Sequence, residues 1–313
     1  IFTSGGTESN NMVLKGLVDF KYPEKFHLIT SEIEHPAILN PALFLSELGG
    51  RVTILPVDAK GLIDPDQVRK AILPDTGLIS IMLANNETGA LQPVREIAEI
   101  AKGYNIPLHT DAAQAVGKIS VQVKALGVDF LSVAGHKLYG PKGVGALYAR
   151  DGLSLTPLIH GAGQEDGRRA GTENTILTVG LGTACRVARE RLPRDEKRIC
   201  HLRDQLQSLL FEGIEDLVLN GPEIKRLPNT LNVSVPGLEG GRILSAIPNV
   251  MASTGAACHD QGVTLSHVLS AMGVSPRVGM GALRFSLGRH NTPEEIEIAA
   301  QAVITQIRRM RDD

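Results

Sequence analysis

Two residues of complementary chemistry stand at the ends of two short apolar runs. The run from Asp129 to Lys137 is typical of a buried strand that ends in a lysine, and the run from Ile106 to Asp111 is typical of a second strand that ends in an aspartate. In open α/β sheets, ligands bind at the carboxyl ends of the strands, so we expect this amine and this carboxylate to face one small molecule. An amine that forms a Schiff base and a carboxylate that pairs with a pyridinium nitrogen are what pyridoxal phosphate requires of a protein.

The same two residues also have a simpler interpretation. Lysines at strand ends are usually solvated, and aspartates there often cap the following helix. The pair alone therefore leaves both interpretations open, and the elements and motifs around it have to decide.

Up to about residue 190, short β-branched runs alternate with helical patterns. We expect strands over residues 27–30, 52–55, 79–83, 108–110, 130–133 and 145–148, and helices over residues 36–48, 66–72 and 94–104. This alternation predicts βαβ units and an α/β fold with a mostly parallel sheet that is covered by helices on both faces.

After about residue 190 the pattern changes to that of a smaller α+β domain. We expect a charged amphipathic helix over residues 195–211, strands over 230–235 and 283–287, a mobile loop over 252–262 and a last helix from Pro293. The predicted organisation is a large ligand-binding domain over residues 1–190 and a small C-terminal domain over residues 191–313 that carries a cysteine loop.

Composition and charge exclude several classes of protein. The chain has 313 residues, 42% of them hydrophobic, and a formal net charge of -2 from interspersed signs, so we predict neither a nucleic-acid partner nor a membrane partner. No apolar run reaches the roughly eighteen residues of a membrane span and no signal peptide opens the chain, which favours the cytoplasm, with an organelle matrix as the alternative. The three cysteines lack Cys-x-x-Cys spacing, so we predict neither a disulfide framework nor a metal site.

Two further motifs suit a phosphorylated ligand with an aromatic ring. Gly5-Gly6-Thr7 opens a helical pattern, where free amides, the helix dipole and a hydroxyl make a phosphate seat, although a simple N-cap is the alternative. His35 precedes Pro36 at the start of the next helical pattern. It either caps that helix or stacks on a cofactor ring and moves protons.

Three residues are candidates for contact with a substrate. Asn86 follows the strongest strand pattern, where its alternative role is turn chemistry. Cys258 lies in the predicted loop and is either a nucleophile or an unreactive thiol. Arg284 lies in a strand-like segment and needs a partner, which is either a substrate carboxylate or an internal glutamate.

The motifs follow one another in a distinctive order along nearly the whole chain. They are Gly5 to Asn11, Glu34-His35, Asn85 to Gly89, His109 to Gln114, Gly135 to Gly143, Arg169 to Thr172, Gly255 to Cys258 and Leu283 to Arg289. In this order and spacing they resemble the class V pyridoxal phosphate enzymes of the cysteine desulfurase group. Within the group, residues 252–259 and 171–175 are most similar to selenocysteine lyase, whereas typical desulfurases favour a serine-rich stretch before the cysteine.

The resemblance implies a homodimer with the fold of type I pyridoxal phosphate-dependent transferases. It implies that Lys137 is the Schiff-base lysine and that Asp111 is the partner of the pyridinium nitrogen. For the cofactor, it implies that His35 stacks on the ring, that Gln114 binds the ring hydroxyl and that Gly6, Thr7 and His136 bind the phosphate, while Thr172 reaches the phosphate of the neighbouring subunit. For the substrate, it implies that Asn86 and Arg284 bind the carboxylate and that Cys258 attacks the sulfur or selenium atom.

The implied reaction removes selenium or sulfur from L-selenocysteine or L-cysteine and leaves L-alanine, with a chalcogen-acceptor protein as a further partner. One alternative is a cysteine desulfurase proper, which supplies persulfide sulfur for Fe–S cluster or thio-cofactor assembly. Another is a different class V enzyme such as a transaminase, in which Cys258 is idle. The alternative from another class is a non-catalytic, truncated homologue that acts only as a binding subunit.

The chain departs from the family pattern in two places. Ala134 stands where many members have a serine that touches the phosphate, so one phosphate hydrogen bond is expected to be missing or replaced. The sequence starts at Ile1 in mid-strand without an initiator methionine, and the family's N-terminal segment is not part of it. We therefore expect a fragment or a processed product.

Overall fold

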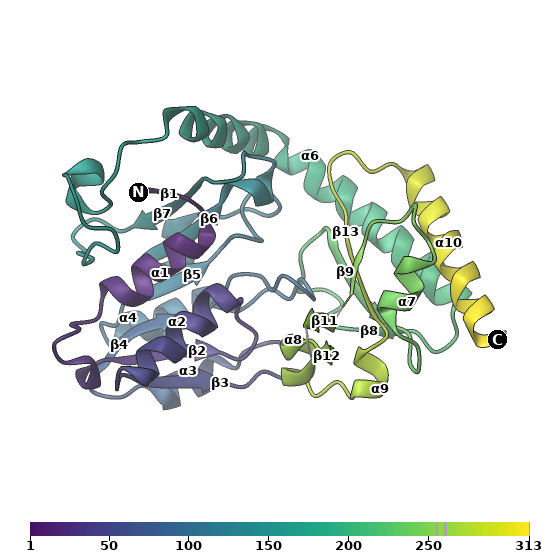
Figure 1. Ribbon diagram of the computed structural model, residues 1–313, viewed down its shortest axis with the longest axis horizontal. Helices are drawn as coiled ribbons and strands as arrows, with labels where there is room; N and C mark the ends of the chain where they lie inside the picture. The colour runs from purple at the N-terminus through teal and green to yellow at the C-terminus, as the bar shows by residue number, and fades with distance from the viewer. Residues whose placement is uncertain (255, 260–261, 313) are drawn as a thin grey trace. The chain divides into compact units, whose positions relative to one another are not determined.

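The structure divides into two compact units. A computed structural model describes residues 1–254, 256–259 and 262–312, with side chains described for all of these except 256–259, 262 and 263. The first unit comprises residues 1–57, 62–85 and 91–192, and the second comprises residues 58–61, 86–90 and 193–313. The main division falls between Leu192 and Pro193, inside the long helix α6 (Thr175–Gly213) (Figure 1). Each unit has its own sheet and its own hydrophobic core.

A seven-stranded sheet organises the first unit, in the order β1-β7-β6-β5-β4-β2-β3. Strands β6, β5, β4, β2 and β3 run parallel, and β7 pairs in antiparallel fashion with both β6 and β1. The strands are β1 (Phe2–Thr3), β2 (His27–Ser31), β3 (Arg51–Leu55), β4 (Thr76–Ser80), β5 (Leu108–Asp111), β6 (Phe130–Ala134) and β7 (Gly145–Ala149). The prediction of an α/β fold with a mostly parallel sheet is confirmed.

Helices cover this sheet because the strand side chains are apolar on both of its faces. The helical elements are α1 (Gly6–Gly16), η1 (Pro23–Lys25), α2 (Pro36–Glu47), α3 (Pro65–Ala71), α4 (Val94–Gly103), α5 (Val123–Leu126), η2 (Gly135–Leu138) and η3 (Gln164–Gly167). Helices α1 and α2 pack against each other and bury Met12 and Ile38 with Leu28 and Phe130 of the strands (Figure 1). Helices α3, α4 and α5 form a second group, in which α4 contacts both of its neighbours.

A buried polar ladder links the three central strands at His109, two residues before Asp111. His109 on β5 is fully buried, with Nδ1 2.8 Å from the Ser80 hydroxyl of β4 and Nε2 2.9 Å from the Ser132 hydroxyl of β6. Burial lowers the pKa of His109 to about 3, so the ring is neutral at physiological pH and both of its nitrogens are satisfied by hydroxyls. This ladder holds three adjacent strands in register next to Asp111.

An antiparallel four-stranded sheet, in the order β10-β13-β9-β8, organises the second unit. Its strands are β8 (Val218–Leu219), β9 (Thr230–Ser234), β10 (Ser253–Thr254) and β13 (Ala282–Ser286), while β11 (Ala256–His259) and β12 (Gly262–Leu265) form a separate pair. The helices are α7 (Gly240–Ser245), α8 (His267–Ala271), α9 (Pro276–Gly279), α10 (Pro293–Asp312) and the second half of α6. Its core joins Leu231 and Phe285 of the strands to Leu206 of α6 and Val303 of α10.

Some predicted element bounds were wrong. Residues 252–262 were predicted to be a mobile loop, but β10, β11 and the start of β12 lie there, because small residues also fit short paired strands. Gly255, Asp260 and Gln261 of that stretch lie outside the described residues. The helix predicted over residues 195–211 instead begins at Thr175 and continues through Pro193, since the flanking residues are good helix formers on both sides. The strand predicted over residues 79–83 is β4, which ends at Ser80.

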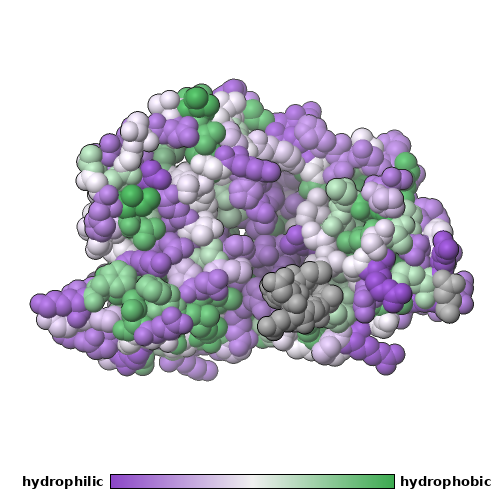
Figure 2. Space-filling model, viewed as in Figure 1, coloured by the Kyte–Doolittle hydropathy of each residue, from purple (hydrophilic) through white to green (hydrophobic). Residues whose placement is uncertain are grey.

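The surface mixes polar and apolar residues. Figure 2 shows hydrophobic residues in separate green areas between larger hydrophilic areas on the viewed face. Of the helices that the structure describes, none combines the length and the apolar character needed to cross a membrane.

Candidate active site

Asp111 and Lys137 leave the sheet at the same edge. β5 ends at Asp111, which lies level with Ser132 of the parallel neighbour β6. Strand β6 ends before Lys137, which lies in the 3-10 turn η2, so the strand predicted to run as far as the lysine is shorter than expected. The turn begins at Gly135 because a Cβ there would lie only 2.8 Å from the Val144 carbonyl oxygen.

The Asp111 carboxylate is held on both of its oxygens. It is 8% exposed, and its Oδ2 accepts a hydrogen bond of 2.7 Å from Nδ2 of Asn10 on α1. Its Oδ1 accepts a hydrogen bond of 2.9 Å from the backbone N–H of Ala113. Asp111 thus caps the following turn, as its simpler interpretation predicts, and is also fixed from a second element.

Asn10 is a functional candidate that sequence reasoning missed. It is 1% exposed on a helix whose next turn buries Met12, Val13 and Leu14. Its Oδ1 is buried and has no hydrogen-bond partner among the residues that the structure describes. An amide on the apolar face of a helix needs a buried partner, and that pattern is visible in the sequence although the identity of the partner is not.

The first turn of α1 lies beside the end of β6. A Cβ added to Gly6 would lie 3.3 Å from the Ala134 Cβ and 3.9 Å from the Ala113 Cβ, so glycine lets the helix start pack closely against the end of β6. Thr7 is exposed in this first turn, whose backbone N–H groups have no partner within the helix itself. The arrangement is that of an anion seat at a helix N-terminus.

Cationic groups gather close to η2. His136 and Lys137 are exposed, and the pKa of His136 is lowered, first by burial and then by the charges of Lys137 and Lys142. A lowered pKa leaves the imidazole neutral at physiological pH, with one N–H to donate to an anion.

The segment that carries Thr172 is tied to α1. Arg169 Nε lies 2.8 Å from Oε1 of Glu8, in an ion pair whose side chains are 23% and 9% exposed. The pKa of Glu8 is lowered by its hydrogen bonds to Arg169 and Ser4, which outweigh the opposing effect of burial. Thr172 itself is exposed.

His35 and Gln114 lie in turns that follow strands of the same sheet. His35 comes four residues after the end of β2 and is the N-cap of α2, since its Nδ1 accepts a hydrogen bond of 3.0 Å from Ala37 N–H. The capping alternative therefore holds, and it orients the ring. Gln114 follows β5, and its side-chain oxygen accepts a hydrogen bond of 2.7 Å from Lys118 Nζ.

In the second unit, Asn86 and Arg284 are in direct contact. Arg284 on β13 donates from Nη1 to the Asn86 carbonyl at 2.9 Å and from Nη2 to the Ser253 hydroxyl at 3.0 Å. Its partners are thus a carbonyl and a hydroxyl rather than the internal glutamate of the alternative. The Nε atom of Arg284 and the Oδ1 atom of Asn86 are buried and have no hydrogen-bond partner among the described residues.

Cys258 lies on strand β11, where it pairs with Val263 of β12. The expectation of a loop at this position was therefore wrong for the backbone. The side chain of Cys258 lies outside the described part of the structure, so its proposed role depends on sequence alone.

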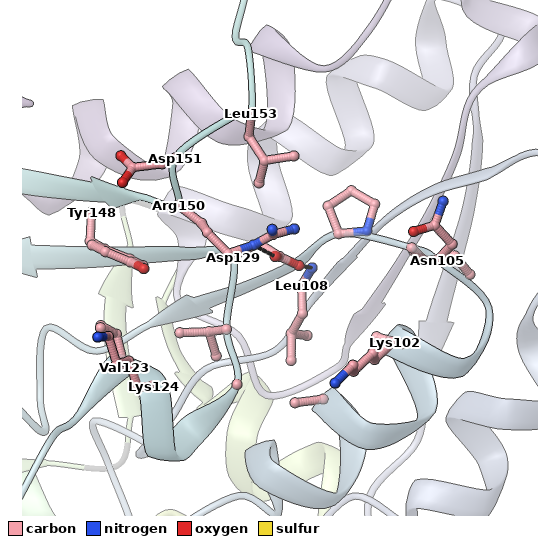
Figure 3. A pocket seen from close by; sticks show the side chains of 16 residues that line it. Lys102, Asn105, Leu108, Val123, Lys124, Asp129, Tyr148, Arg150, Asp151 and Leu153 are labelled. Atoms are coloured by element: carbon pink, nitrogen blue, oxygen red, sulfur yellow. Dashed lines mark hydrogen bonds and ion pairs between the residues drawn. The ribbon is translucent and has the colours of Figure 1, made fainter.

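A pocket of the first unit lies at the opposite edge of the sheet, where the parallel strands begin. It has a volume of about 770 Å³, and Figure 3 shows Lys102, Lys124 and Tyr148 around it. Leu108 and Asp129, which also line it, stand at the amino ends of β5 and β6, where Arg150 pairs with Asp129 at 2.6 Å. This pocket is therefore distinct from the edge that carries Asp111 and Lys137. No group of three or more histidine, cysteine or acidic side chains suited to a metal occurs within the described residues.

Comparisons with known proteins show the family to which the chain belongs. The model of the family described as aminotransferase class-V matches residues 1–298. The chain belongs to this family. It is 47% identical to "Cysteine desulfurase IscS" of Dictyoglomus turgidum, over 99% of this chain and 79% of that protein. It is 43% identical to "Cysteine desulfurase, mitochondrial" of Arabidopsis thaliana, over 100% of this chain and 69% of that protein.

A solved structure agrees with this assignment. The structure titled "NIFS-LIKE PROTEIN" superposes with a TM-score of 0.91 at 38% identity, over 98% of this chain and 82% of the other. The predicted membership of the class V group of cysteine desulfurases is confirmed, and so is its fold. The family depends on pyridoxal phosphate, which confirms the predicted cofactor at the level of the family.

Proposed function

We propose that the chain is a pyridoxal phosphate-dependent cysteine desulfurase that removes sulfur from L-cysteine and leaves L-alanine. The observation that carries the proposal is the exit of a buried carboxylate, Asp111, and an amine, Lys137, from adjacent parallel strands at one edge of the sheet. It is supported by relatives of 42–47% identity that are named cysteine desulfurases. These relatives favour sulfur over selenium as the element removed.

The residues at this edge fit the cofactor. Asp111 offers an acceptor to a protonated ring nitrogen, and Lys137 offers an amine for covalent attachment. Because Gly6 has no side chain, the first turn of α1, with its free backbone N–H groups, lies close to Ala134 at the end of β6, where these groups can hold a phosphate. Pyridoxal phosphate, when bound, supplies an electron sink that makes the substrate Cα–H acidic and weakens its Cβ–S bond.

Side chains of the first unit hold the cofactor and transfer protons. The Lys137 amine moves the Cα proton as general base and acid, while Asp111 keeps a proton on the ring nitrogen. His35 would stack on the ring and transfer protons, and Gln114 would donate to the ring hydroxyl. Thr7, His136 and the amide of Gly6 would hold the phosphate, and Thr172 would reach the phosphate of a second subunit.

Residues of the second unit act on the substrate. Arg284 and Asn86 would bind its carboxylate, a role that suits the Arg284 guanidinium because Asn86 orients it and its Nε has no hydrogen-bond partner among the described residues. The Cys258 thiolate takes the sulfur atom as a persulfide. The persulfide sulfur then passes to an acceptor protein. We propose that the active form is a homodimer and that it is located in the cytoplasm or an organelle matrix.

Removal of selenium from L-selenocysteine is the second candidate function. The small residues Ala256 and Ala257 directly before Cys258 favour it, because this stretch is similar to that of selenocysteine lyases. The two candidate functions assign the same role to every residue except Cys258. Selenium leaves more readily than sulfur, so its removal depends less on the Cys258 nucleophile.

The direct test is to incubate the purified, cofactor-loaded chain with L-cysteine and L-selenocysteine separately and to measure alanine. We expect alanine from cysteine in the presence of a thiol that releases persulfide sulfur as sulfide. Alanine from selenocysteine only would favour the lyase. Keto-acid-dependent turnover without sulfide would point to a transaminase, and failure to bind the cofactor would point to a non-catalytic subunit.

Replacement of Cys258 by alanine separates the two chalcogens. We expect the variant to lose sulfide release from cysteine by roughly 10²-fold or more, because the nucleophile that accepts sulfur is gone. Alanine formation from selenocysteine is expected to fall less. Cys185→Ala, at an exposed cysteine on α6, serves as the matched control. Full cysteine turnover by Cys258→Ala would remove the nucleophile role from this residue.

A further inference from the structure

Glu34 is a fully buried carboxyl group in the turn between β2 and α2. It is 0% exposed, and its Oε1 accepts a hydrogen bond of 2.8 Å from the Ser31 hydroxyl and another of 2.9 Å from the Met82 backbone N–H. Ser31 ends β2, and Met82 follows β4, which is the neighbouring parallel strand. Glu34 therefore joins the exits of two strands at the edge that carries Asp111.

A second buried hydrogen bond joins the same two segments. The Asn85 side-chain amide, which is 0% exposed, donates to the Ile33 carbonyl at 3.0 Å. Two adjacent residues of the turn before α2, Ile33 and Glu34, thus bind the segment that follows β4. Two such bonds leave the turn little freedom to shift relative to the sheet.

His35 comes directly after this fixed turn. Its Nδ1 accepts from Ala37 N–H, so a neutral ring carries its proton on Nε2 and is anchored at both ends of the residue, by Glu34 before it and by α2 after it. The hydrogen bonds of Glu34 consequently determine where the imidazole ring stands at the edge of the sheet.

The ionisation of Glu34 is linked to Asp111. Burial and, to a smaller extent, the negative charge of Asp111 together raise the pKa of Glu34 to about 8, against the opposing effects of the Met82 and Ser31 hydrogen bonds. Among the groups that face Glu34 are Asp111 from β5, the hydroxyl of Ser31 from β2 and the backbone N–H of Met82 after β4, and His35 is next to it in the chain. At neutral pH Asp111 is therefore not opposed by a second negative charge from Glu34.

We propose that Glu34 is a positioning residue for the cofactor, whose buried hydrogen bonds to Ser31 and Met82 fix the turn that presents His35 at the edge that carries Asp111. The proposal rests on the proposed function. It implies that ionisation of Glu34 at alkaline pH weakens cofactor binding, because the ionised carboxylate puts a second negative charge near Asp111 and disturbs the turn. Glutamine has the same shape and keeps the acceptor oxygen but cannot ionise. Glu34→Gln should therefore keep the turn in place and lose the weakening of cofactor binding at alkaline pH.

The test measures pyridoxal phosphate affinity of the full chain by fluorescence titration between about pH 6.5 and 9.5. We expect the dissociation constant of the wild type to rise more steeply above about pH 8 than that of Glu34→Gln. Glu34→Ala is expected to bind the cofactor roughly tenfold more weakly at neutral pH, since two buried donors lose their acceptor, and Glu34→Gln should restore most of the loss. Glu32→Gln, at a neighbouring carboxylate of the same turn, is the matched control and should behave as the wild type.

Thermal unfolding of the cofactor-free chain gives a second readout. An unfolded glutamate has a pKa of 4.5 and Glu34 in the folded chain one of about 8, so the folded chain holds this proton more tightly. Wild-type stability from this group is therefore fully present below about pH 4.5 and is lost as the pH rises toward 8, whereas Glu34→Gln has no such loss. The difference between the melting temperature of Glu34→Gln and that of the wild type should therefore increase as the pH rises from about 4.5 to about 8.

The outcomes separate this proposal from the proposed function. If the wild type binds the cofactor and releases sulfur, but Glu34→Gln shows the same alkaline weakening and the same melting profile as the wild type, the role of Glu34 is refuted. If the wild type itself fails to bind pyridoxal phosphate, the proposed function is refuted, while the melting comparison still reports on Glu34. If Glu34→Ala does not fold, the two pH profiles of Glu34→Gln decide.

Discussion

Replacement of Lys137 by alanine is expected to abolish covalent attachment of pyridoxal phosphate and to lower sulfur release from cysteine below detection. The amine is proposed to carry the cofactor and to move the Cα proton, and loss of a general base alone costs roughly 10²–10⁴-fold in rate. The measurements are alanine formation and the visible absorption band of the bound cofactor. Lys137 is exposed in η2, so its truncation should leave the fold intact.

Lys124→Ala is the matched control for this variant. Lys124 is an exposed lysine of α5 that lines the pocket at the opposite edge of the sheet. We expect this control to keep both the absorption band and the turnover of the wild type. A Lys137→Ala variant that did the same would contradict the central assignment.

Replacement of Asp111 by asparagine is expected to leave a folded chain that binds the cofactor but turns over at least about 100-fold more slowly. Asparagine has the same shape and can still accept the hydrogen bond from Ala113, but it lacks the charge that keeps the ring nitrogen protonated. The measurements are the rate of alanine formation and the absorption spectrum as a function of pH.

Asp129→Asn is the corresponding control on the same sheet. Asp129 stands before β6 at the amino edge, where it pairs with Arg150 and accepts from Leu108 N–H. Its loss of charge is expected to reduce stability slightly and to leave the cofactor spectrum unchanged. Equal effects of the two substitutions on the spectrum would show that the charge of Asp111 has no special role.

The alternation of β-branched runs and helical patterns was sufficient to predict the first unit. Parallel strands buried on both faces have to be continuously apolar, and the chain between them has to be long enough for a crossover helix. The motif order then identified the family, and the strand exits explained why Asp111 and Lys137 share an edge.

The bounds of the elements were less predictable where short-range signals conflict. Pro193 favours the end of a helix, yet α6 continues through it, because good helix formers flank it on both sides. The stretch around Cys258 has small residues without periodicity, which predicts a loop, but pairing between β11 and β12 gives it a strand conformation. Around Cys258 the tertiary context overrides a weak local preference.

Buried polar contacts were the part of the site that sequence reasoning could not supply. Asn10 and Asp111 are 101 residues apart and Glu34 and Met82 are 48 apart, so no local pattern predicts that they meet. Each of these polar residues stands in an apolar or turn segment, which signals that a partner is needed but does not identify it. The partners followed only from the register of the parallel strands.

The most direct test of the central claim is to load the purified chain with pyridoxal phosphate, make the lysine–cofactor linkage permanent with borohydride, and map the modified peptide by mass spectrometry. The account predicts a single pyridoxyl group on Lys137, in the peptide that follows strand β6. A stable modification on any other lysine, or none at all in a folded chain with bound cofactor, would contradict it.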